Sequence, residues 1–319
     1  MEARSRYPEV ISIGNMLVEI MRTGLDQPLD RAGDFTGPYP SGDTPIYIDT
    51  VARLGHSCGF IGAVGQDSFG DCLMNRLRDD GVDTSEVRVL PDRTTGVAFV
   101  AYFSGGNRRF IYHWKDAAAG QVAPEYIDPS YLMNARWLHI TGCNLAVNAS
   151  ARDACYRAVD LLPEGATLSF DPNIRPEILS VDEIIELCKP VLERANVFLP
   201  SSGEGRMFAG TADDEAGCRW FAERGKTVVL KQGAEGCRVF TSATEFHAPG
   251  FSVTEVDPTG AGDSFCAGFT VGMLEGMSLP DAARFANATG ALAVTKQGPM
   301  EGAPWRADVD AFLAHHPSR

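Results

Sequence analysis

The sequence lacks the short motifs by which many metal, redox and nucleotide sites are recognised. Its eight cysteines include no C-x-x-C pair and its six histidines form no H-E-x-x-H, so neither a zinc site nor a dithiol redox site is indicated. It also contains no G-x-x-x-x-G-K-[ST], and no G-x-G-x-x-G follows an expected strand. These absences disfavour a P-loop enzyme and a dinucleotide-dependent oxidoreductase.

Basic residues and long apolar runs are also scarce. Lysine and arginine total 28 against 42 aspartates and glutamates, which gives a net charge of −14 and argues against nucleic acid or an anionic membrane as a partner. No apolar run approaches membrane-spanning length, and the polar first residues, MEARSRYPE, do not resemble a signal peptide. With no sign of a disulfide framework, we expect a cytoplasmic protein that holds any anionic ligand in a local site.

What the sequence does contain is a regular alternation of short apolar runs with helical patterns. This alternation predicts an α/β fold with a largely parallel, helix-covered sheet. The expected strands are Val10–Gly14, Gly59–Val64, Trp137–Ile140, Thr167–Phe170, Val197–Leu199 and Thr227–Leu230. The expected helices are Asp43–Leu54, Phe69–Asp80, Ala149–Leu162, Val181–Ala195, Ala212–Arg224 and Leu279–Lys296.

Two segments, residues 17–42 and 94–114, break this alternation. In the second, TTGVAFVAYF and RRFIYHW are predicted strands joined by the turn-forming SGGN. We interpret the two segments as a small accessory sheet, which is either an ordinary edge hairpin or a lid that closes over a substrate. Since no linker or internal repeat interrupts the chain, residues 1–319 are expected to form a single domain.

The stretch DPTGAGDSFCAGF, residues 257–269, places three small residues directly before a carboxylate. An expected strand, Phe251–Val256, precedes it, and an expected helix, Ser264–Gly276, follows it. In that order, the backbone N–H groups of Gly260 to Asp263 converge at a helix N-terminus and attract an anion. Asp263 is then either a helix cap or a base that removes a proton from a hydroxyl. Only other features of the chain can decide between these two roles.

The whole stretch resembles the C-terminal signature of the ribokinase-like (PfkB) carbohydrate kinases, in which D-T-x-G-A-G-D begins a helix. Further similarity extends over nearly the whole chain, in PSGDTPIYIDTVARLG (40–55), GAVGQDSFG (62–70) and FDPNIRP (170–176). The last segment resembles the D-x-N-x-R of the branch that holds fructokinases and 2-keto-3-deoxygluconate kinases. The resemblance implies a three-layer α/β/α domain with a mostly parallel sheet and a small β-sheet lid.

The resemblance also implies a reaction and its catalytic residues. The γ-phosphoryl group of Mg·ATP would move to a sugar hydroxyl, with Asp263 as general base and the backbone of Gly260, Ala261 and Gly262 as anion hole. Nucleotide contacts would come from Lys231, Gly233, Gly236, Thr259, Gly262 and Asn287.

The metal residues carry over from the family less completely. In the family's N-x-x-E segment, Glu204 matches the glutamate that orders Mg²⁺ through water, whereas Ser201 replaces the asparagine. Asn173 is a second metal candidate, although DPN also reads as a simple turn. The resemblance leaves a requirement for a monovalent cation open, and it allows a homodimer through the lid.

The sugar side departs from many relatives, because Ser41 and Ile46 stand where a glycine and an asparagine are common. The expected sugar contacts are Asn15, Gly42, Asp43, Tyr102, Arg109, Tyr112 and Arg175. Arg175 favours a 2-keto-3-deoxy sugar acid, while GPYPSG and the apolar residues after it also suit fructose or tagatose. A nucleoside kinase and a non-catalytic sugar- or nucleotide-binding protein are the remaining alternatives.

Overall fold

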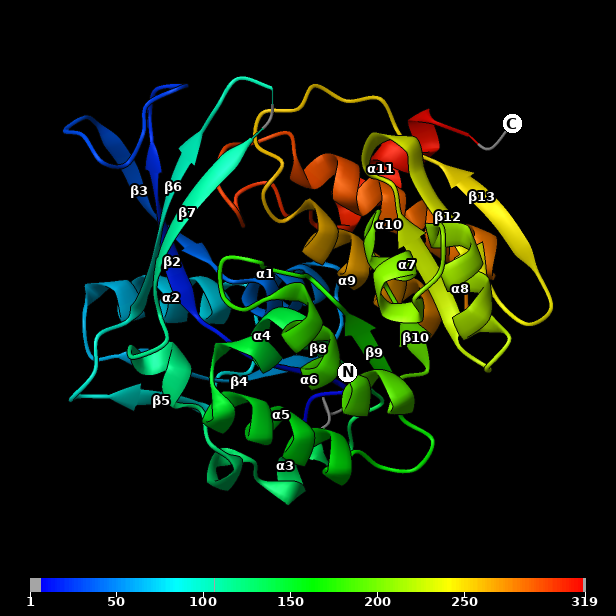
Figure 1. Ribbon diagram of the computed structural model, residues 1–319, viewed down its shortest axis with the longest axis horizontal. Coiled ribbons are helices and arrows are strands. Elements are labelled where there is room, and N and C mark those ends of the chain that lie inside the picture. The colour runs from blue at the N-terminus through cyan, green and yellow to red at the C-terminus, as the bar shows by residue number, and fades with distance from the viewer. Residues whose placement is uncertain (1–6, 106, 318–319) are drawn as a thin grey trace.

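The structure is a computed structural model that describes residues 7–105 and 107–317 (Figure 1). Most of the polar N-terminal stretch, residues 1–6, and Gly106 of the expected SGGN turn lie outside the described residues. Within the described ranges, no helix is both long and apolar enough to cross a membrane.

The larger sheet has the strand order β13-β12-β11-β10-β9-β8-β1-β4-β5 in the described part of the chain. Strands from β11 to β5 in this order are parallel, and β12 and β13 are added antiparallel at one edge. The strands are β1 (Val10–Ile13), β4 (Cys58–Gly65), β5 (Val87–Leu90), β8 (Trp137–Thr141), β9 (Thr167–Asp171), β10 (Val197–Phe198), β11 (Thr227–Lys231), β12 (Gly236–Phe240) and β13 (Glu245–Pro249).

Helices cover both faces of this sheet, because its central strands are buried on both sides. One face packs against α1 (Asp43–Arg53), α2 (Ser68–Asp79), α9 (Ala261–Leu274), α10 (Leu279–Ala293) and α11 (Arg306–His315). The other packs against α3 (Pro129–Leu132), α4 (Gly142–Val147), α5 (Ala149–Leu161), α6 (Val181–Arg194) and α8 (Asp214–Ala222). The short α7 (Glu204–Ala209) and the 3₁₀ turns η1 (Ala118–Gln121), η2 (Pro124–Tyr126) and η3 (Gly233–Glu235) lie in the connections. The predicted α/β fold with a mostly parallel, helix-covered sheet is confirmed.

The accessory sheet is also present and is separate from the larger one (Figure 1). Its strand order is β3-β2-β6-β7, formed by β2 (Leu17–Arg22), β3 (Phe35–Ser41), β6 (Gly96–Tyr102) and β7 (Arg108–His113). We call it the lid sheet. One face of the lid sheet is turned toward the larger sheet and the other away from it. Successive side chains of each strand therefore lie alternately on the inner and the outer face.

One expected element is wrong. Phe251–Val256 is irregular backbone, not a strand, and the strand before α9 is β13. The contacts of this segment explain why it does not form a strand. The N–H of Val256 donates to the carbonyl of Val294 just after α10, and the Phe251 ring packs on Phe312 of α11. The segment therefore follows the ends of helices and is not part of either sheet in the described structure. Helix α9 also begins at Ala261, three residues before the expected start.

Candidate active site

The turn before α9 brings backbone donors to one point. Gly260 has φ +81°, and a Cβ at this position would lie 2.4 Å from the carbonyl oxygen of Pro299. Glycine is therefore required both by the backbone conformation and by the close approach of the neighbouring loop. Helix α9 starts at the next residue, and the first N–H groups of a helix have no carbonyl partner within it. This geometry suits an anion.

Two cavities meet at this turn, and both are lined by Lys231, Pro258 and Gly262. The lid cavity, of about 500 Å³, lies under the lid sheet and contains Asp263. The α9–α10 cavity, of about 630 Å³, lies on the other side of Gly262. A ligand in one cavity can therefore face a ligand in the other across the helix N-terminus.

Asp263 lies in a strongly acidic environment at the lid cavity. Burial raises the pKa of its carboxyl group well above the usual value, and the nearby carboxylates of Asp43 and Asp171 raise it further. Lys231 and Arg175 act in the opposite direction. A carboxyl group with a raised pKa is a stronger proton acceptor once it is ionised, which is the property that a general base needs.

Lys231, at the end of β11, is paired with Asp171 at the end of β9. Its Nζ contacts Asp171 Oδ2 and lies 3.6 Å from the sulfur of Cys266. The buried environment lowers the pKa of Lys231, but the nearby anions, Asp171 above all, outweigh this and raise it overall. Lys231 is therefore a fixed positive charge on the wall shared by the two cavities.

Asp43, the first residue of α1, is held by a network of side chains. Its Oδ2 accepts hydrogen bonds from Thr141 Oγ1 at 2.7 Å and from Asn173 Nδ2 at 2.8 Å. Asn144 Nδ2 approaches the other oxygen at 3.4 Å, and Asn144 Oδ1 in turn accepts from Asn15. The carboxylate is thus fixed in orientation toward the lid cavity, where it can accept hydrogen bonds from hydroxyl groups.

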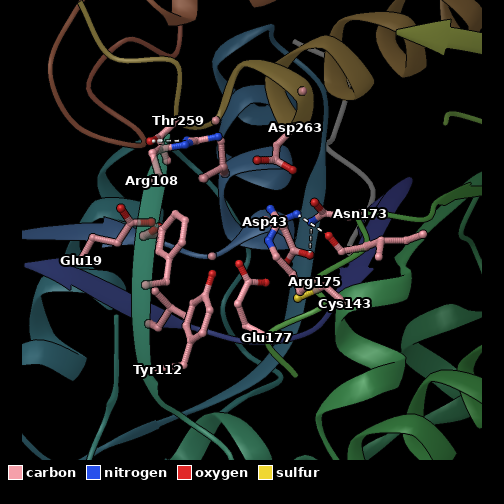
Figure 2. Close-up of a pocket in the computed structure, with 18 of the residues that line it drawn as sticks. Glu19, Asp43, Arg108, Tyr112, Cys143, Asn173, Arg175, Glu177, Thr259 and Asp263 are labelled. Atoms are coloured by element: carbon pink, nitrogen blue, oxygen red, sulfur yellow. Dashed lines mark hydrogen bonds between the residues drawn. The ribbon is translucent and has the colours of Figure 1, made fainter. Parts of the chain in front are cut away.

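The lid cavity has polar walls on both sides (Figure 2). Asp43, Asn173 and Arg175 lie on the side of the larger sheet, and Glu19 and Tyr112 lie on the lid side. Expected sugar contacts that do line this cavity are Gly42, Asp43, Tyr112 and Arg175.

The Arg175 guanidinium donates to the carbonyl of Ile174 at 3.1 Å. Burial lowers its pKa, but neighbouring groups that include Asp43 and Asp263 outweigh this and raise it. Since a guanidinium has five N–H donors, most remain for a ligand. Tyr112 stacks between Phe110 and Trp114, with ring centroids 5.4 and 4.6 Å away, and so presents a rigid aromatic surface.

Glu204, the predicted metal residue, begins α7 and is almost buried. Its two carboxylate oxygens accept hydrogen bonds from the backbone N–H groups of Ile174 at 3.0 Å and Ser201 at 2.6 Å. It therefore ties the loop after β9 to the loop after β10. Asn173, the other metal candidate, is tied to Asp43 and has φ +40°. No cluster of three or more His, Cys, Asp or Glu side chains that could hold a metal occurs among the described residues.

The expected nucleotide residues fall mainly on the α9–α10 cavity. Gly233, Gly236 and Asn287 line it, together with Ala261 and Gly262. The Asn287 amide donates to the carbonyls of Ala248 and Pro249, at 3.0 and 3.2 Å, and so also secures the end of β13. Thr259 differs from the expectation, because it lines the lid cavity instead.

Three expected sugar contacts are not on the cavity wall. Arg109 lies on the opposite face of β7, with its guanidinium over the Phe103 ring, and its neighbour Arg108 lines the cavity. Asn15 is buried beneath the cavity against Asn144. The Tyr102 hydroxyl group lies 3.2 Å from Asp257 Oδ1 and 3.3 Å from Thr259 Oγ1, outside the cavity lining.

Several polar residues of the site were not expected from the sequence, notably Glu19, Arg108 and Asn144. Because side chains alternate along β7, only one of the two adjacent arginines can face the cavity. The fold, and not the local sequence, determines which of them does. Glu19 lies in LVEIMR, where an acidic residue at alternate spacing suggests a solvent-facing position. In the structure it is only 5% exposed, and Ser41 at the end of β3 donates to its carboxylate.

The chain is similar in sequence and in fold to known proteins. A family model described as pfkB family carbohydrate kinase matches residues 12–306. The chain is 32% identical to 2-dehydro-3-deoxygluconokinase of Bacillus subtilis over 269 residues, which cover 83% of each protein.

Two solved structures are similar over nearly the full length. The first is a "putative Ribokinase II" from E. coli in complex with ATP and Mg²⁺, with 40% identity, a TM-score of 0.91 and coverage of 97% of this chain and 100% of that one. The second is a fructokinase double mutant from Vibrio cholerae O395 with fructose, ADP and potassium bound. It has 27% identity, a TM-score of 0.80 and the same coverage.

Proposed function

Because the chain belongs to the PfkB family of carbohydrate kinases, it is an ATP-dependent sugar kinase, and we propose that its acceptor is a 2-keto-3-deoxy sugar acid of the gluconate type. The observation that supports the reaction most directly is the position of Asp263, beside a helix N-terminus at which two cavities meet. The sugar occupies the lid cavity, and ATP occupies the α9–α10 cavity with its γ-phosphate at the turn.

In this mechanism, Asp263 accepts the proton of the acceptor hydroxyl group. The sugar oxygen forms a bond to the γ-phosphorus while the bond from that phosphorus to the β–γ bridging oxygen breaks, and ADP leaves with the electron pair of that oxygen. The backbone N–H groups at Gly260, Ala261 and Gly262 stabilise the negative charge on the transferring phosphoryl group. The proton then passes from Asp263 to solvent.

Mg²⁺ fits this site as an ion carried by the ATP phosphates. Mg²⁺ keeps several waters and is commonly held by phosphate oxygens with one or two carboxylates, so a dedicated cluster of ligands is not needed. Asn173 lines the lid cavity and Glu204 lies just behind the linings, with a second lone pair on each oxygen beyond its backbone hydrogen bond, so both residues would hold the ion through water. When bound, Mg²⁺ would supply neutralisation of the negative charge on the ATP phosphates.

Arg175 supports the choice of a sugar acid. Its guanidinium lines the lid cavity with most of its donors free of protein partners, and a planar guanidinium can hold a carboxylate through two hydrogen bonds. A second candidate is a neutral ketohexose such as fructose or tagatose. It is favoured by the acceptor groups Glu19 and Asp43, which suit hydroxyl groups, and by the similarity to the fructose-bound enzyme.

The experiment that tests this function is ADP release with Mg·ATP over a panel of 2-keto-3-deoxygluconate, fructose, tagatose, ribose and adenosine. We expect selective turnover of 2-keto-3-deoxygluconate, and we expect Arg175→Met to raise KM for the acid more than for a neutral sugar. Selective turnover of fructose or tagatose would replace the sugar acid by the ketohexose, and no turnover of any compound would contradict the assignment of substrate.

Asp263→Asn tests the proposed base. We expect turnover to fall by about 10²- to 10⁴-fold, because general base catalysis contributes factors of this size. Affinity for ATP should be nearly unchanged, since Asn keeps the shape of the side chain; calorimetric titration measures it. In the wild type, kcat should fall as pH decreases through the raised pKa of Asp263, because only the ionised carboxylate accepts the proton. Equal turnover by Asp263→Asn would remove this residue from the mechanism.

Two further parts of the proposal concern a cation and a second subunit. Since a related fructokinase was solved with potassium, exchange of K⁺ for tetramethylammonium in the same assay tests for a monovalent cation.

The outer face of the lid sheet exposes Phe35 and Ile111 at 41% and 45%, and we propose that the lid of a second copy covers them. Light scattering should give a dimer mass for the wild type and a smaller mass for Ile111→Lys.

A further inference from the structure

Of the three basic residues that line the lid cavity, Lys231 has a carboxylate partner, whereas Arg108 and Arg175 have none among the described residues. Lys231 is paired with Asp171, and Arg175 donates to a backbone carbonyl. Arg108 donates from Nη1 to the hydroxyl group of Thr259 at 3.2 Å, and no carboxylate in the described part of the chain lies within 4 Å of it. A guanidinium has five N–H donors, so this hydrogen bond leaves donors for an anion.

The lid holds this guanidinium beside the helix N-terminus. Thr259 immediately precedes Gly260, and Figure 2 shows the Arg108 side chain linked to Thr259 on the side of the cavity where Asp263 lies. Arg108 pairs with Tyr102 across strands β7 and β6, and the Tyr102 hydroxyl group contacts the same turn through Asp257 and Thr259. Two adjacent lid residues thus bring the end of the β6–β7 hairpin onto the turn that precedes the anion hole.

We propose that Arg108 is a further catalytic residue, whose guanidinium contacts the transferring phosphoryl group and stabilises its charge when the lid is closed. The proposal rests on the proposed kinase function, with ATP in the α9–α10 cavity. Arginine suits this position because its planar group is always charged and binds phosphate oxygens through two hydrogen bonds. Charge on the equatorial oxygens is what a phosphoryl-transfer site has to stabilise.

Delivery of this charge by the lid has a functional advantage. The backbone donors of Gly260 to Gly262 are fixed to α9, whereas Arg108 reaches the turn only while β7 lies over the cavity. Complete stabilisation of the phosphoryl group therefore requires closure, and closure excludes water from the site. Transfer to a bound sugar is favoured over hydrolysis of ATP.

The first test compares Arg108→Gln and Arg108→Lys with Arg109→Gln. Arg109 is the matched control, because it loses the same charge from the adjacent position of β7 but faces away from the cavity. We expect kcat to fall by about 10²- to 10³-fold in Arg108→Gln, less in Arg108→Lys, and by less than twofold in Arg109→Gln. Added guanidinium chloride at millimolar concentration should restore part of the activity of Arg108→Gly. An equal effect at both positions would overturn the proposal.

The second test does not depend on turnover. Calorimetry measures the affinity for Mg·ADP and for Mg²⁺ with β,γ-methylene-ATP, and the ratio of the two isolates the contribution of the γ-phosphate. Arg108→Gln should reduce this ratio at least tenfold, while Arg109→Gln should leave it unchanged. An unchanged ratio in Arg108→Gln would reject a contact with the phosphoryl group. If the wild type phosphorylates no sugar, the proposed substrate fails and this ratio alone decides the role of Arg108.

Discussion

Glu19 is a buried carboxyl group of the lid sheet. Ser41 Oγ donates to its Oε1 at 2.6 Å, but Oε2 is buried and has no hydrogen-bond partner among the described residues. Burial raises the pKa of Glu19 from 4.5 to about 7, and the charge of Asp257 adds to this effect. A sugar hydroxyl group in the lid cavity would supply the missing donor.

This position predicts how stability changes with pH. The folded protein holds the Glu19 proton more tightly than the unfolded chain, so the contribution of Glu19 is present below pH 4.5 and is lost as pH rises toward 7. At about 1.4 kcal/mol per pH unit, the loss is on the order of 3 kcal/mol. Glu19→Gln should therefore be more stable than the wild type at pH 8 and not at pH 4.5, as measured by urea unfolding.

The control for this prediction is Glu177→Gln, which removes an acid from an exposed position of the same cavity. We expect it to change the pH dependence little. A Glu19→Gln variant with the same pH dependence as the wild type would show that Glu19 is already ionised without cost in the folded state.

At this scale, the sequence predicted residue chemistry better than side-chain direction. Asp263, Asp43 and Arg175 carry groups that a phosphoryl-transfer site needs, and all three line the lid cavity. The sequence analysis placed Arg109 at the sugar, but Arg108 is the residue that lines the cavity. Neighbouring residues of a strand point to opposite faces, and composition does not reveal which face is covered.

The start of α9 is the element on which the site depends. Gly260 forms its N-cap in the left-handed region, and the loop that contains Pro299 lies against it. This loop is held in turn by Arg76 of α2, which donates to the carbonyl of Met300 at 2.6 Å and is paired with buried Asp49. The position of the backbone donors thus depends on packing among α1, α2 and α9.

Gly260→Ala should therefore reduce activity by more than the cost of placing an alanine in a left-handed conformation, because the new Cβ also meets Pro299. The left-handed conformation costs about 1–2 kcal/mol for a residue with a Cβ, and the contact with Pro299 O requires a further shift of the turn. We expect turnover to fall at least 10²-fold, since displacement of a catalytic group by about 1 Å has effects of this size. Thermal unfolding and steady-state kinetics measure the two effects.

Gly276→Ala is the matched control at the other end of the helix. Gly276 also has a positive φ, of +74°, but no atom lies within 4 Å of the position of a Cβ. It should lose about 1–2 kcal/mol of stability and keep its turnover. Similar kinetics for the two variants would contradict the importance of the close contact at Gly260.

Element prediction succeeded where the local signal was strong. The GAG turn and the apolar run after it predicted α9 within three residues, because small residues, a helix start and a buried pattern coincide. Phe251–Val256 failed because its alternating residues fit a strand, yet the N–H of Val256 donates to the carbonyl of Val294 after α10 and the segment joins neither sheet. The local sequence cannot show whether a hydrogen-bonding partner is available.

The whole molecule combines a layered core with a separate lid sheet (Figure 1), and one face of the lid sheet lines the lid cavity. Strands such as β1 and β8 are buried on both sides, whereas β3 and β7 have many exposed residues. The layered core could be predicted from the alternation of strands and helices. The placement of the lid over the C-terminal ends of β9 and β11 required contacts between segments far apart in the sequence.

Hydrogen exchange should distinguish these two parts. Elements with few buried contacts open at lower free energy, so amides of β3 and β7 should exchange faster than those of β1 and β8 in the free protein. A saturating sugar substrate with Mg·ADP should slow exchange in the lid at least tenfold and change the core strands little. Mass spectrometry after timed labelling measures both. A lid that is equally protected with and without ligand would contradict closure.

The wall formed by Lys231, Pro258 and Gly262 has a stereochemical consequence. It belongs to both cavities, so in the proposed mechanism the donor and the acceptor meet there and the phosphoryl group passes directly from one to the other. A single direct displacement inverts the configuration at the phosphorus atom. A γ-phosphate made chiral with oxygen isotopes should therefore be recovered on the sugar with inverted configuration, whereas retention would reveal a phosphorylated enzyme.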